Sequence, residues 1–152
     1  MDPDLLAVPD LAAAARATLR LAGAAVLGGL IGFEREQAGK AAGLRTHMMV
    51  ALGAAMFVMV PIEVGLDPGD LSRVIQGIAA GMGFLGGGTI LKRASSDDIE
   101  GLTSAATIWF TGAIGIAAGA GQFWIAAIGV VCAWAVLKIA LGLDNWAHRS
   151  RG

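Results

Sequence analysis

Charged residues are scarce in this sequence. Asp, Glu, Lys and Arg together make up 15% of the 152 residues, whereas about a quarter is usual in soluble domains. Apolar residues make up 56%, so there is too little polar surface to cover a soluble core. The net charge is −1 and no basic run occurs, which argues against nucleic acid as a partner. The composition predicts an integral membrane protein whose first partner is the lipid bilayer.

Cysteine and catalytic motifs are also nearly absent. Cys132 is the single cysteine, which excludes an intrachain disulfide and a thiolate metal cluster, and we expect it to be a small buried side chain. His47 has no second His or Cys at ligand spacing, so it is interpreted as an interfacial polar residue, and we expect no metal and no cofactor. No Ser-His-Asp or paired-carboxylate pattern indicates an enzyme. The acidic N-terminus does not resemble a secretory signal.

Apolar runs of 15 to 21 residues fill most of the chain. They predict an all-α membrane fold of about five transmembrane helices at 17–33, 48–62, 74–91, 103–120 and 123–143. The first helix begins as early as Leu11 if Arg16 and Arg20 snorkel to the membrane surface. The second is short for a hydrocarbon core about 30 Å thick, so we expect it either to begin earlier, near Leu44, or to thin the bilayer. Residues 1–16 are then an external segment, 17–143 the transmembrane domain and 144–152 a cytoplasmic tail, with Asp144 and Asn145 ending the fifth helix.

Lys and Arg are distributed unequally between the two sides of this topology. Short loops rich in these residues are retained in the cytoplasm. One side carries seven of them, namely Arg35, Lys40, Arg45, Lys92, Arg93, Arg149 and Arg151. The other side carries only Arg16, Arg20 and Arg73. We therefore expect the N-terminus outside and the C-terminus in the cytoplasm.

Glycine is abundant, with 23 residues that lie largely inside the predicted helices. In water each would cost up to about 1 kcal/mol of helix stability. In membranes, pairs of small residues four positions apart are typical of helix faces that pack closely. Four glycine pairs of this spacing lie inside the predicted helices: Gly28/Gly32, Gly77/Gly81, Gly83/Gly87 and Gly115/Gly119. We favour packing within the chain, and a homodimer interface is the alternative.

A weak internal repeat relates the second and fourth helices. Residues 43–46 (Gly-Leu-Arg-Thr) and 101–104 (Gly-Leu-Thr-Ser) each open an apolar span. If the similarity is meaningful, helices one and two and helices three and four form two parallel hairpins, followed by a fifth helix. Chance similarity between short glycine-rich segments is the alternative.

Two polar segments, 34–47 and 92–104, lie on the predicted cytoplasmic side. The residues of this candidate interaction site are Glu34, Arg35, Glu36, Lys40, Arg45, Thr46, Lys92, Arg93, Glu100 and Thr103. Ordinary anchoring of the helices, with solvated ion pairs worth at most about 1 kcal/mol each, is one interpretation. The other is that the N-termini of the second and fourth helices, beside basic residues, favour an anion or an acidic partner residue.

The glycine-rich segment 81–89 lacks the Lys-Ser/Thr of a phosphate-binding loop and lies in an apolar span. Close packing is our main interpretation of it. The alternative is a helix broken in mid-membrane, as transporters use for substrate sites. Gln76 and Thr89 would then form a candidate intramembrane polar site.

Four segments in chain order resemble the MgtC/SapB family of bacterial inner-membrane proteins. They are Gly-Leu-Ile-Gly-Phe-Glu-Arg-Glu (29–36), Ala-Gly-Leu-Arg-Thr-His (42–47), Gly-Met-Gly-Phe-Leu-Gly-Gly-Gly-Thr-Ile (81–90) and Gly-Leu-Thr-Ser-Ala-Ala-Thr-Ile-Trp (101–109). The resemblance implies a multi-pass regulator in adaptation to magnesium limitation, acting through other membrane proteins, the ATP synthase among them. The virulence-type members carry a soluble C-terminal domain and an asparagine at the position of Thr103. The four matching segments lie in the predicted transmembrane domain, so we expect the membrane core of the family without that soluble domain.

Two functions are compatible with these patterns. A regulator that works by contact needs exposed loops and helix faces. A transporter of a small ion, magnesium or a proton, needs polar groups across the membrane, and Gln76, Thr89, Thr107 and Thr111 are those at hand. The sequence puts no charged residue at the bilayer centre, where such residues usually mark conduits. We therefore favour the regulator.

Overall fold

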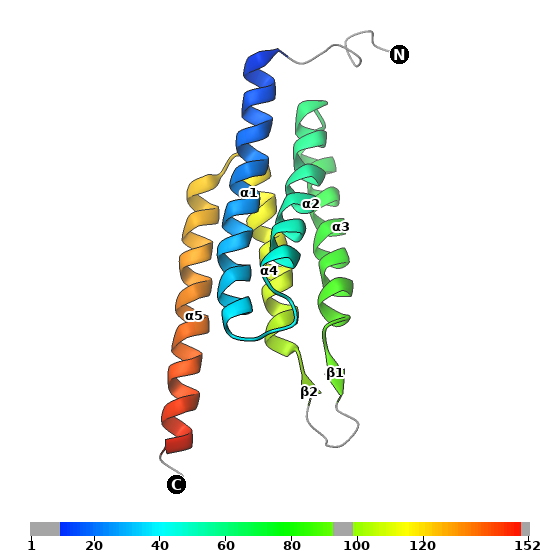
Figure 1. Ribbon diagram of the computed structural model, residues 1–152. Helices are drawn as coiled ribbons and strands as arrows, with labels where there is room; N and C mark the ends of the chain where they lie inside the picture. Colours follow the sequence, from blue (N-terminus) through cyan, green and yellow to red (C-terminus); the bar gives the residue numbers. More distant parts are fainter. Residues whose placement is uncertain (1–9, 93–98, 150–152) are drawn as a thin grey trace.

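The computed structural model describes the backbone of residues 10–92 and 99–149. The five helices are α1 (Leu11–Gln37), α2 (Leu44–Glu63), α3 (Pro68–Gly87), α4 (Leu102–Gly119) and α5 (Phe123–Arg149). Two short strands, β1 (Leu91–Lys92) and β2 (Ile99–Glu100), form an antiparallel pair between α3 and α4. The helices run alternately up and down (Figure 1), so the α1–α2 loop, the strand pair and the end of α5 lie at one end of the bundle. We call this the strand end.

Most predicted helix starts agree with the structure. Helix α1 begins at Leu11, where the Asp10 carboxylate accepts a hydrogen bond from the Ala13 backbone N–H at 2.6 Å, a standard N-cap. Helix α2 begins at Leu44, the position that bilayer thickness required. The prediction that Asp144 and Asn145 end the fifth helix is wrong, because the backbone of α5 stays helical to Arg149.

Helix α3 differs most from its predicted range. It begins at Pro68, six residues before the apolar run, because proline is favoured in the first turn, where its missing N–H costs no hydrogen bond. It ends at Gly87 and not at Leu91. Between these residues α3 is continuous, so the glycine segment ends the helix and does not break it in mid-membrane.

Among the described residues, three helices are long and apolar enough to cross a membrane: α1, α2 and α4. Helix α5 contains a shorter apolar stretch, Phe123–Ile139. Large apolar side chains such as Val26, Phe57 and Ile128 lie exposed on the outside of the bundle, as a lipid environment requires. The predicted all-α membrane fold is confirmed.

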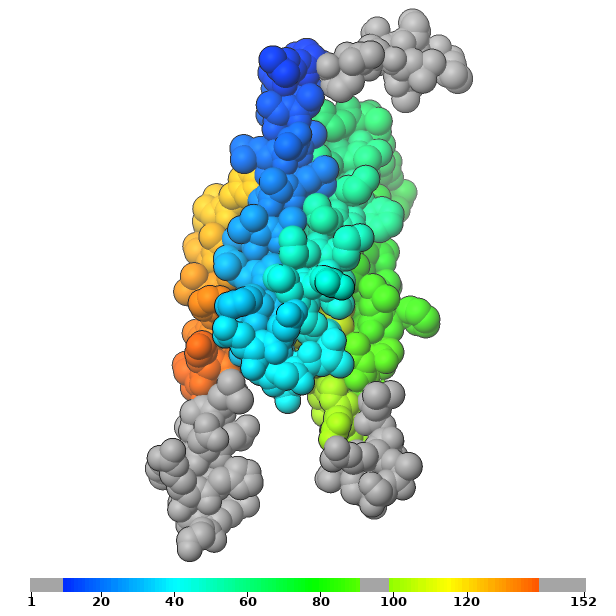
Figure 2. Space-filling model, viewed as in Figure 1, coloured from blue at the N-terminus to red at the C-terminus, as the bar shows by residue number. Residues whose placement is uncertain are grey.

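The centre of the bundle is built from small residues. Helix α1 packs mainly on α2, both contact α4, and α5 lies against α1 and α4. Ala24, Ala51, Ala55 and Ala118 are fully buried there. In Figure 2 the blue and cyan surfaces of α1 and α2 adjoin without a gap, while the green α3 lies at the edge of the molecule. Helix α3 rests on α4 and touches α2 only lightly.

Glycine packing holds for two of the four predicted pairs. A methyl group added at Gly28 would lie 2.6 Å from the Ala51 Cβ, and one added at Gly119 would lie 2.6 Å from the Ala55 carbonyl oxygen. Gly32 and Gly115 are equally close to the α2 backbone. The prediction of packing within the chain is wrong for the α3 pairs, because a methyl group at Gly77, Gly81, Gly83 or Gly87 would meet no atom within 4 Å.

The hairpins α1–α2 and α3–α4 point the same way (Figure 1), and Gly43 and Gly101 are the N-cap residues of α2 and α4. Their local conformations differ. Gly43 is extended, whereas Gly101 has φ +94°, which only glycine adopts readily. The repeat thus describes the order and direction of the helices, not the shape of the caps.

Candidate functional site

Three ionisable side chains are buried where the last turn of α1 meets the first turn of α2. Glu34 is 7% exposed, Arg35 3% and His47 0%. Arg35 Nη1 lies 3.7 Å from Glu34 Oε2. The two helices are close because Gly32 packs against the backbone of Gly43 and Leu44. The expected solvated ion pair is therefore wrong for Glu34 and Arg35, which pair inside the protein.

His47 is fixed in this cluster by its own helix. Its Nδ1 lies 2.9 Å from the Gly43 carbonyl oxygen. A carbonyl only accepts, so Nδ1 donates and, in the neutral ring, Nε2 is an acceptor. Nε2 has no hydrogen-bond partner. The expectation of an interfacial residue is wrong for His47, which is enclosed by protein.

Several polar atoms of the cluster lack hydrogen-bond partners. Besides His47 Nε2, these are Glu34 Oε2, Arg35 Nε and Arg35 Nη2. A buried polar group without a partner costs about 1–3 kcal/mol, and more when it is charged. Such groups in a native fold call for an explanation. Among the described residues, no group of three or more His, Cys, Asp or Glu side chains could hold a metal ion.

The other predicted interaction residues have different surroundings. Glu36, Lys40, Arg45, Thr46, Glu100 and Thr103 are exposed at the strand end. The Glu36 carboxylate accepts a hydrogen bond from the Leu44 backbone N–H at 2.9 Å and so caps α2. Arg93 lies outside the described residues, as does the side chain of Lys92.

A groove of about 660 Å³ separates the first half of α2 from the last half of α3. Its lining includes Thr46, Met49, Gly83, Gly87 and Thr89. The fold therefore brings together Thr46 and Thr89, which the sequence assigned to two different sites. Gln76 does not join them, because it lies on the exposed face of α3 more than three helical turns from Thr89.

The threonine hydroxyls that a conduit would use are engaged locally. Thr89 donates to the Gly86 carbonyl at 2.7 Å, Thr107 to Ser104 at 2.9 Å and Thr111 to Thr107 at 2.8 Å. Hydroxyls bonded to their own helix in this way have satisfied their donors.

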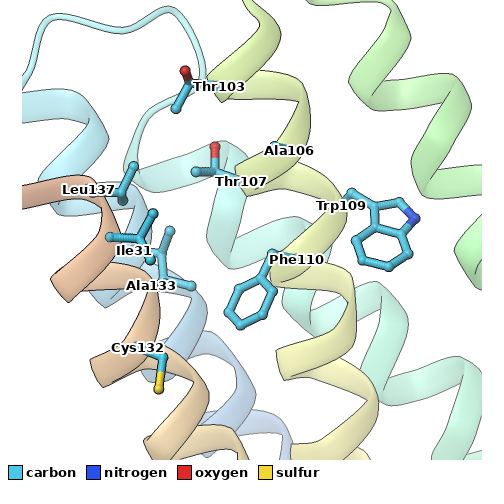
Figure 3. Close-up of a pocket in the computed structure, with 10 residues that line it drawn as sticks. Ile31, Thr103, Ala106, Thr107, Trp109, Phe110, Cys132, Ala133 and Leu137 are labelled. Atoms are coloured by element: carbon cyan, nitrogen blue, oxygen red, sulfur yellow. The ribbon is translucent and has the colours of Figure 1, made fainter. Parts of the chain in front are cut away.

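A second groove, of about 450 Å³, lies between α4 and α5 over α1 (Figure 3). Its walls are apolar and include Ile31, Phe110 and Leu137, and Thr103 lies toward its strand end. Cys132 lines this groove and is exposed, so the expectation that it is buried is wrong.

Sequence reasoning missed the burial of Arg35, although a signal for it exists. Gly28, Gly32 and Arg35 are spaced by four and three residues, which places them on one helix face. The glycines of this face make the closest helix contact, so the neighbouring helix also covers the arginine one turn further along. Helix periodicity therefore predicts a buried Arg35, whereas loop hydropathy does not.

Comparison with known proteins agrees with the fold. The MgtC family model matches residues 21–146. Protein SrpB of Synechococcus elongatus is 45% identical over 74% of this chain and 68% of SrpB. The putative magnesium transporter YhiD of Escherichia coli K12 is 41% identical over 80% of this chain and 59% of YhiD. Protein MgtC of Brucella abortus is 47% identical over 73% of this chain and 45% of that protein.

The chain thus spans about half to two thirds of the length of these relatives. No solved structure matches it. The family model covers more than half of the chain, and its range includes α2, α3 and α4 and most of α1 and α5. This membrane protein belongs to the MgtC family.

Proposed function

We propose that this protein is a regulator in the bacterial inner membrane that serves adaptation to low magnesium by contact with other membrane proteins. The link to magnesium rests on the family resemblance and on YhiD, whose name describes a putative magnesium transporter. The observation that carries the contact mechanism is the two uncovered glycine pairs of α3, Gly77/Gly81 and Gly83/Gly87, of which the second lines the α2–α3 groove.

The outer face of α3 differs from the other outer faces of the bundle. Helices α1, α2 and α5 expose large apolar side chains such as Val26, Phe57 and Ile128. Helix α3 exposes Phe84 and Leu85 as well, but it is the helix that also leaves Gly77, Gly81, Gly83 and Gly87 exposed, with the polar Gln76 beside them. In a bilayer, faces of small residues mark the places where helix backbones meet, and polar side chains hydrogen-bond across such contacts. A helix of another membrane protein provides both the backbone that packs on the glycines and a hydrogen-bond partner for Gln76.

Exposed basic residues extend this surface at the strand end. Lys40 and Arg45 lie in and beside the α1–α2 loop, and Thr46 lines the groove. With the strand end in the cytoplasm, as the distribution of basic residues predicts, these charges meet an acidic segment of the partner. The protein then binds both a helix of the partner in the membrane and a charged segment of the partner next to that helix.

Transport of a small ion is the second candidate function. The buried Glu34, Arg35 and His47 favour it, since ionisable groups inside membrane bundles are usually functional. Against it, the cluster lies in the last turn of α1 and not at mid-helix. The hydroxyls of Thr107 and Thr111 also donate to their own helix. The local bonding of these groups supports the regulator.

Growth in low magnesium tests the proposal, in a host whose own copy of the gene is deleted. Gly83→Leu adds a side chain at a groove position where an added Cβ would meet no described atom within 4 Å, and Arg45→Glu reverses an exposed charge. Both variants should fold and fail to restore growth. The controls are Gly53→Leu, where an added Cβ also meets no described atom within 4 Å, and Arg16→Glu at the opposite end.

Thr111→Val is the matched test of a conduit, because it removes a buried hydroxyl with little change of shape. It should restore growth like the wild type. Normal growth with Gly83→Leu and Arg45→Glu, together with lost growth for Thr111→Val, would reject the regulator in favour of transport.

A further inference from the structure

Arg35 has an unused binding edge. Its Nη1 faces Glu34 at 3.7 Å, while Nε and Nη2 have no hydrogen-bond partner among the residues that the structure describes. The N–H groups of Nε and Nη2 point in the same direction and form one side of the planar guanidinium. This side matches two oxygens of one phosphate or carboxylate group. The arginine therefore lacks an oxyanion at the position that its geometry suits best.

The apolar groove of Figure 3 begins one helical turn from this arginine. Ile31 precedes Arg35 by four residues on α1, so both side chains lie on the same buried face. Ile31 is part of the groove wall with Phe110 and Leu137. The groove opens outward between α4 and α5, where the membrane surrounds the bundle. Its size of about 450 Å³ is in the range of ligand sites.

Polar groups are gathered at the strand end of the groove. Thr103, on the first turn of α4, is exposed and lines it. Helix α4 begins after Gly101, which has no side chain to cap the first N–H groups, and such a helix end favours an anion. Lys138, directly after the groove residue Leu137, is exposed. The threonine Thr103 and the start of α4 thus lie at the strand end of the apolar groove, and Lys138 lies next to one of its lining residues.

We propose that the α1–α4–α5 groove holds an acyl chain of an anionic phospholipid whose phosphate is bound by the free edge of Arg35. The acyl chain suits the apolar walls, and the phosphate supplies the two acceptor oxygens that Nε and Nη2 lack. To reach the Thr103 mouth, the long arginine side chain turns away from Glu34 and gives up the 3.7 Å contact, and the bound phosphate has to offset the cost of separating this buried pair. Because Glu34 remains nearby as a negative charge, the site suits a singly charged phosphodiester such as phosphatidylglycerol. This site is independent of the partner contact proposed above.

The test compares the melting temperature of the purified full chain in detergent after addition of phosphatidylglycerol, phosphatidylcholine or inorganic phosphate. Phosphatidylglycerol should raise it by several degrees, because a ligand that binds only the folded state stabilises that state. Phosphatidylcholine and inorganic phosphate should have little effect, since one lacks net charge and the other an acyl chain. Equal stabilisation by inorganic phosphate, or by phosphatidylcholine, would overturn the proposal.

Two matched pairs of variants locate the site. Arg35→Gln should abolish the preference for phosphatidylglycerol over phosphatidylcholine, and Arg45→Gln, at an exposed position of the same end, should keep it. Ala106→Trp places a large side chain in the groove, whereas Ala135→Trp places one at an exposed position outside the groove. Of these two tryptophan variants, only Ala106→Trp should lose the preference for phosphatidylglycerol. The comparison between them tests the proposed site even if Arg35→Gln does not fold. Retention of the preference in Ala106→Trp, or its equal loss in Arg45→Gln, would indicate general surface attraction and refute the site.

Discussion

The Glu34–Arg35 ion pair lies where water cannot stabilise either charge. Both side chains are at least nine-tenths buried, and each keeps polar atoms without hydrogen-bond partners. In such a pair the mutual attraction roughly offsets the loss of hydration, but either charge alone is strongly unfavourable. At the scale of residues, the stability of the fold is therefore more sensitive to loss of one member of the pair than to loss of both.

A double-mutant comparison tests this sensitivity. Arg35→Met should lower the free energy of unfolding by roughly 3–5 kcal/mol, because it leaves the Glu34 carboxylate buried alone. Adding Glu34→Gln should recover much of that loss. Arg45→Met, at an exposed position, should change stability by no more than about 0.5 kcal/mol. Denaturant unfolding in mixed micelles measures these variants, the Glu34→Gln single variant and the wild type, and additive losses in the double variant would show that the two charges are not coupled.

Helix ends and helix contacts carry the stability at the scale of elements. The Glu36 carboxylate accepts the Leu44 backbone N–H at 2.9 Å from eight residues away, which ties the α1–α2 loop to the start of α2. Helix α2 begins after Gly43, which has no side chain to cap it. Trp134 donates to the Leu30 carbonyl at 3.1 Å and joins α5 to α1. These bonds fix the relative positions of α1, α2 and α5.

Glu36→Ala removes the cap of α2. It should lower the free energy of unfolding by about 1 kcal/mol, the usual effect of losing an N-cap acceptor. Gln37→Ala, the next residue and likewise exposed, should have almost no effect. Thermal unfolding in detergent measures both, and equal stability of the two variants would mean that the carboxylate does not cap the helix.

Glycine substitutions distinguish the packed helix faces from the free one. Gly28→Leu and Gly119→Leu force α1 and α4 away from α2 and should each cost at least about 1–3 kcal/mol. Gly81→Leu, on the outer face of α3, should leave the stability of the monomer unchanged. Melting temperatures of the purified variants provide the comparison. A loss in Gly81→Leu as large as that in Gly28→Leu would show that a second chain already covers this face in detergent.

Hydropathy was enough to place the starts of α4 and α5, because each begins within one residue of its apolar run, and bilayer thickness moved the expected start of α2 from Met48 to Leu44. Hydropathy did not predict the start of α3, because its first six residues, from Pro68 to Arg73, are mostly polar and precede the apolar run. Hydropathy also placed Glu34, Arg35 and His47 at the surface. The burial of these residues results from the contact between Gly32 and α2, and contacts between helices are not encoded in the hydropathy of either helix. The two-residue strands are too short to leave a pattern.

The whole molecule has a closely packed centre with α3 on one side of it and α5 on the other. Helices α1, α2 and α4 form the packed part, while α3 leaves its glycine face uncovered by the described residues. The exposed basic residues of the α1–α2 loop lie at the strand end beside the α2–α3 groove. This arrangement supports a protein that works through its surface and not through a pore.

The orientation of the bundle in the membrane can be measured directly. In a Cys132→Ser background, a cysteine at Asp67 should react with an impermeant maleimide in intact cells, and one at Lys40 should react only after the cells are opened. Both positions are exposed, and they lie at opposite ends of α2. Labelling of the Lys40→Cys variant in intact cells would reverse the orientation.

Ion flux in proteoliposomes tests the contact mechanism most directly. The purified chain, reconstituted at known density, is compared with protein-free liposomes for uptake of magnesium and of protons. The account predicts no flux above the protein-free level for either ion, because the hydroxyls between the helices are bonded to their own helix turns. Saturable flux that Thr111→Val abolishes would contradict it and establish transport as the function.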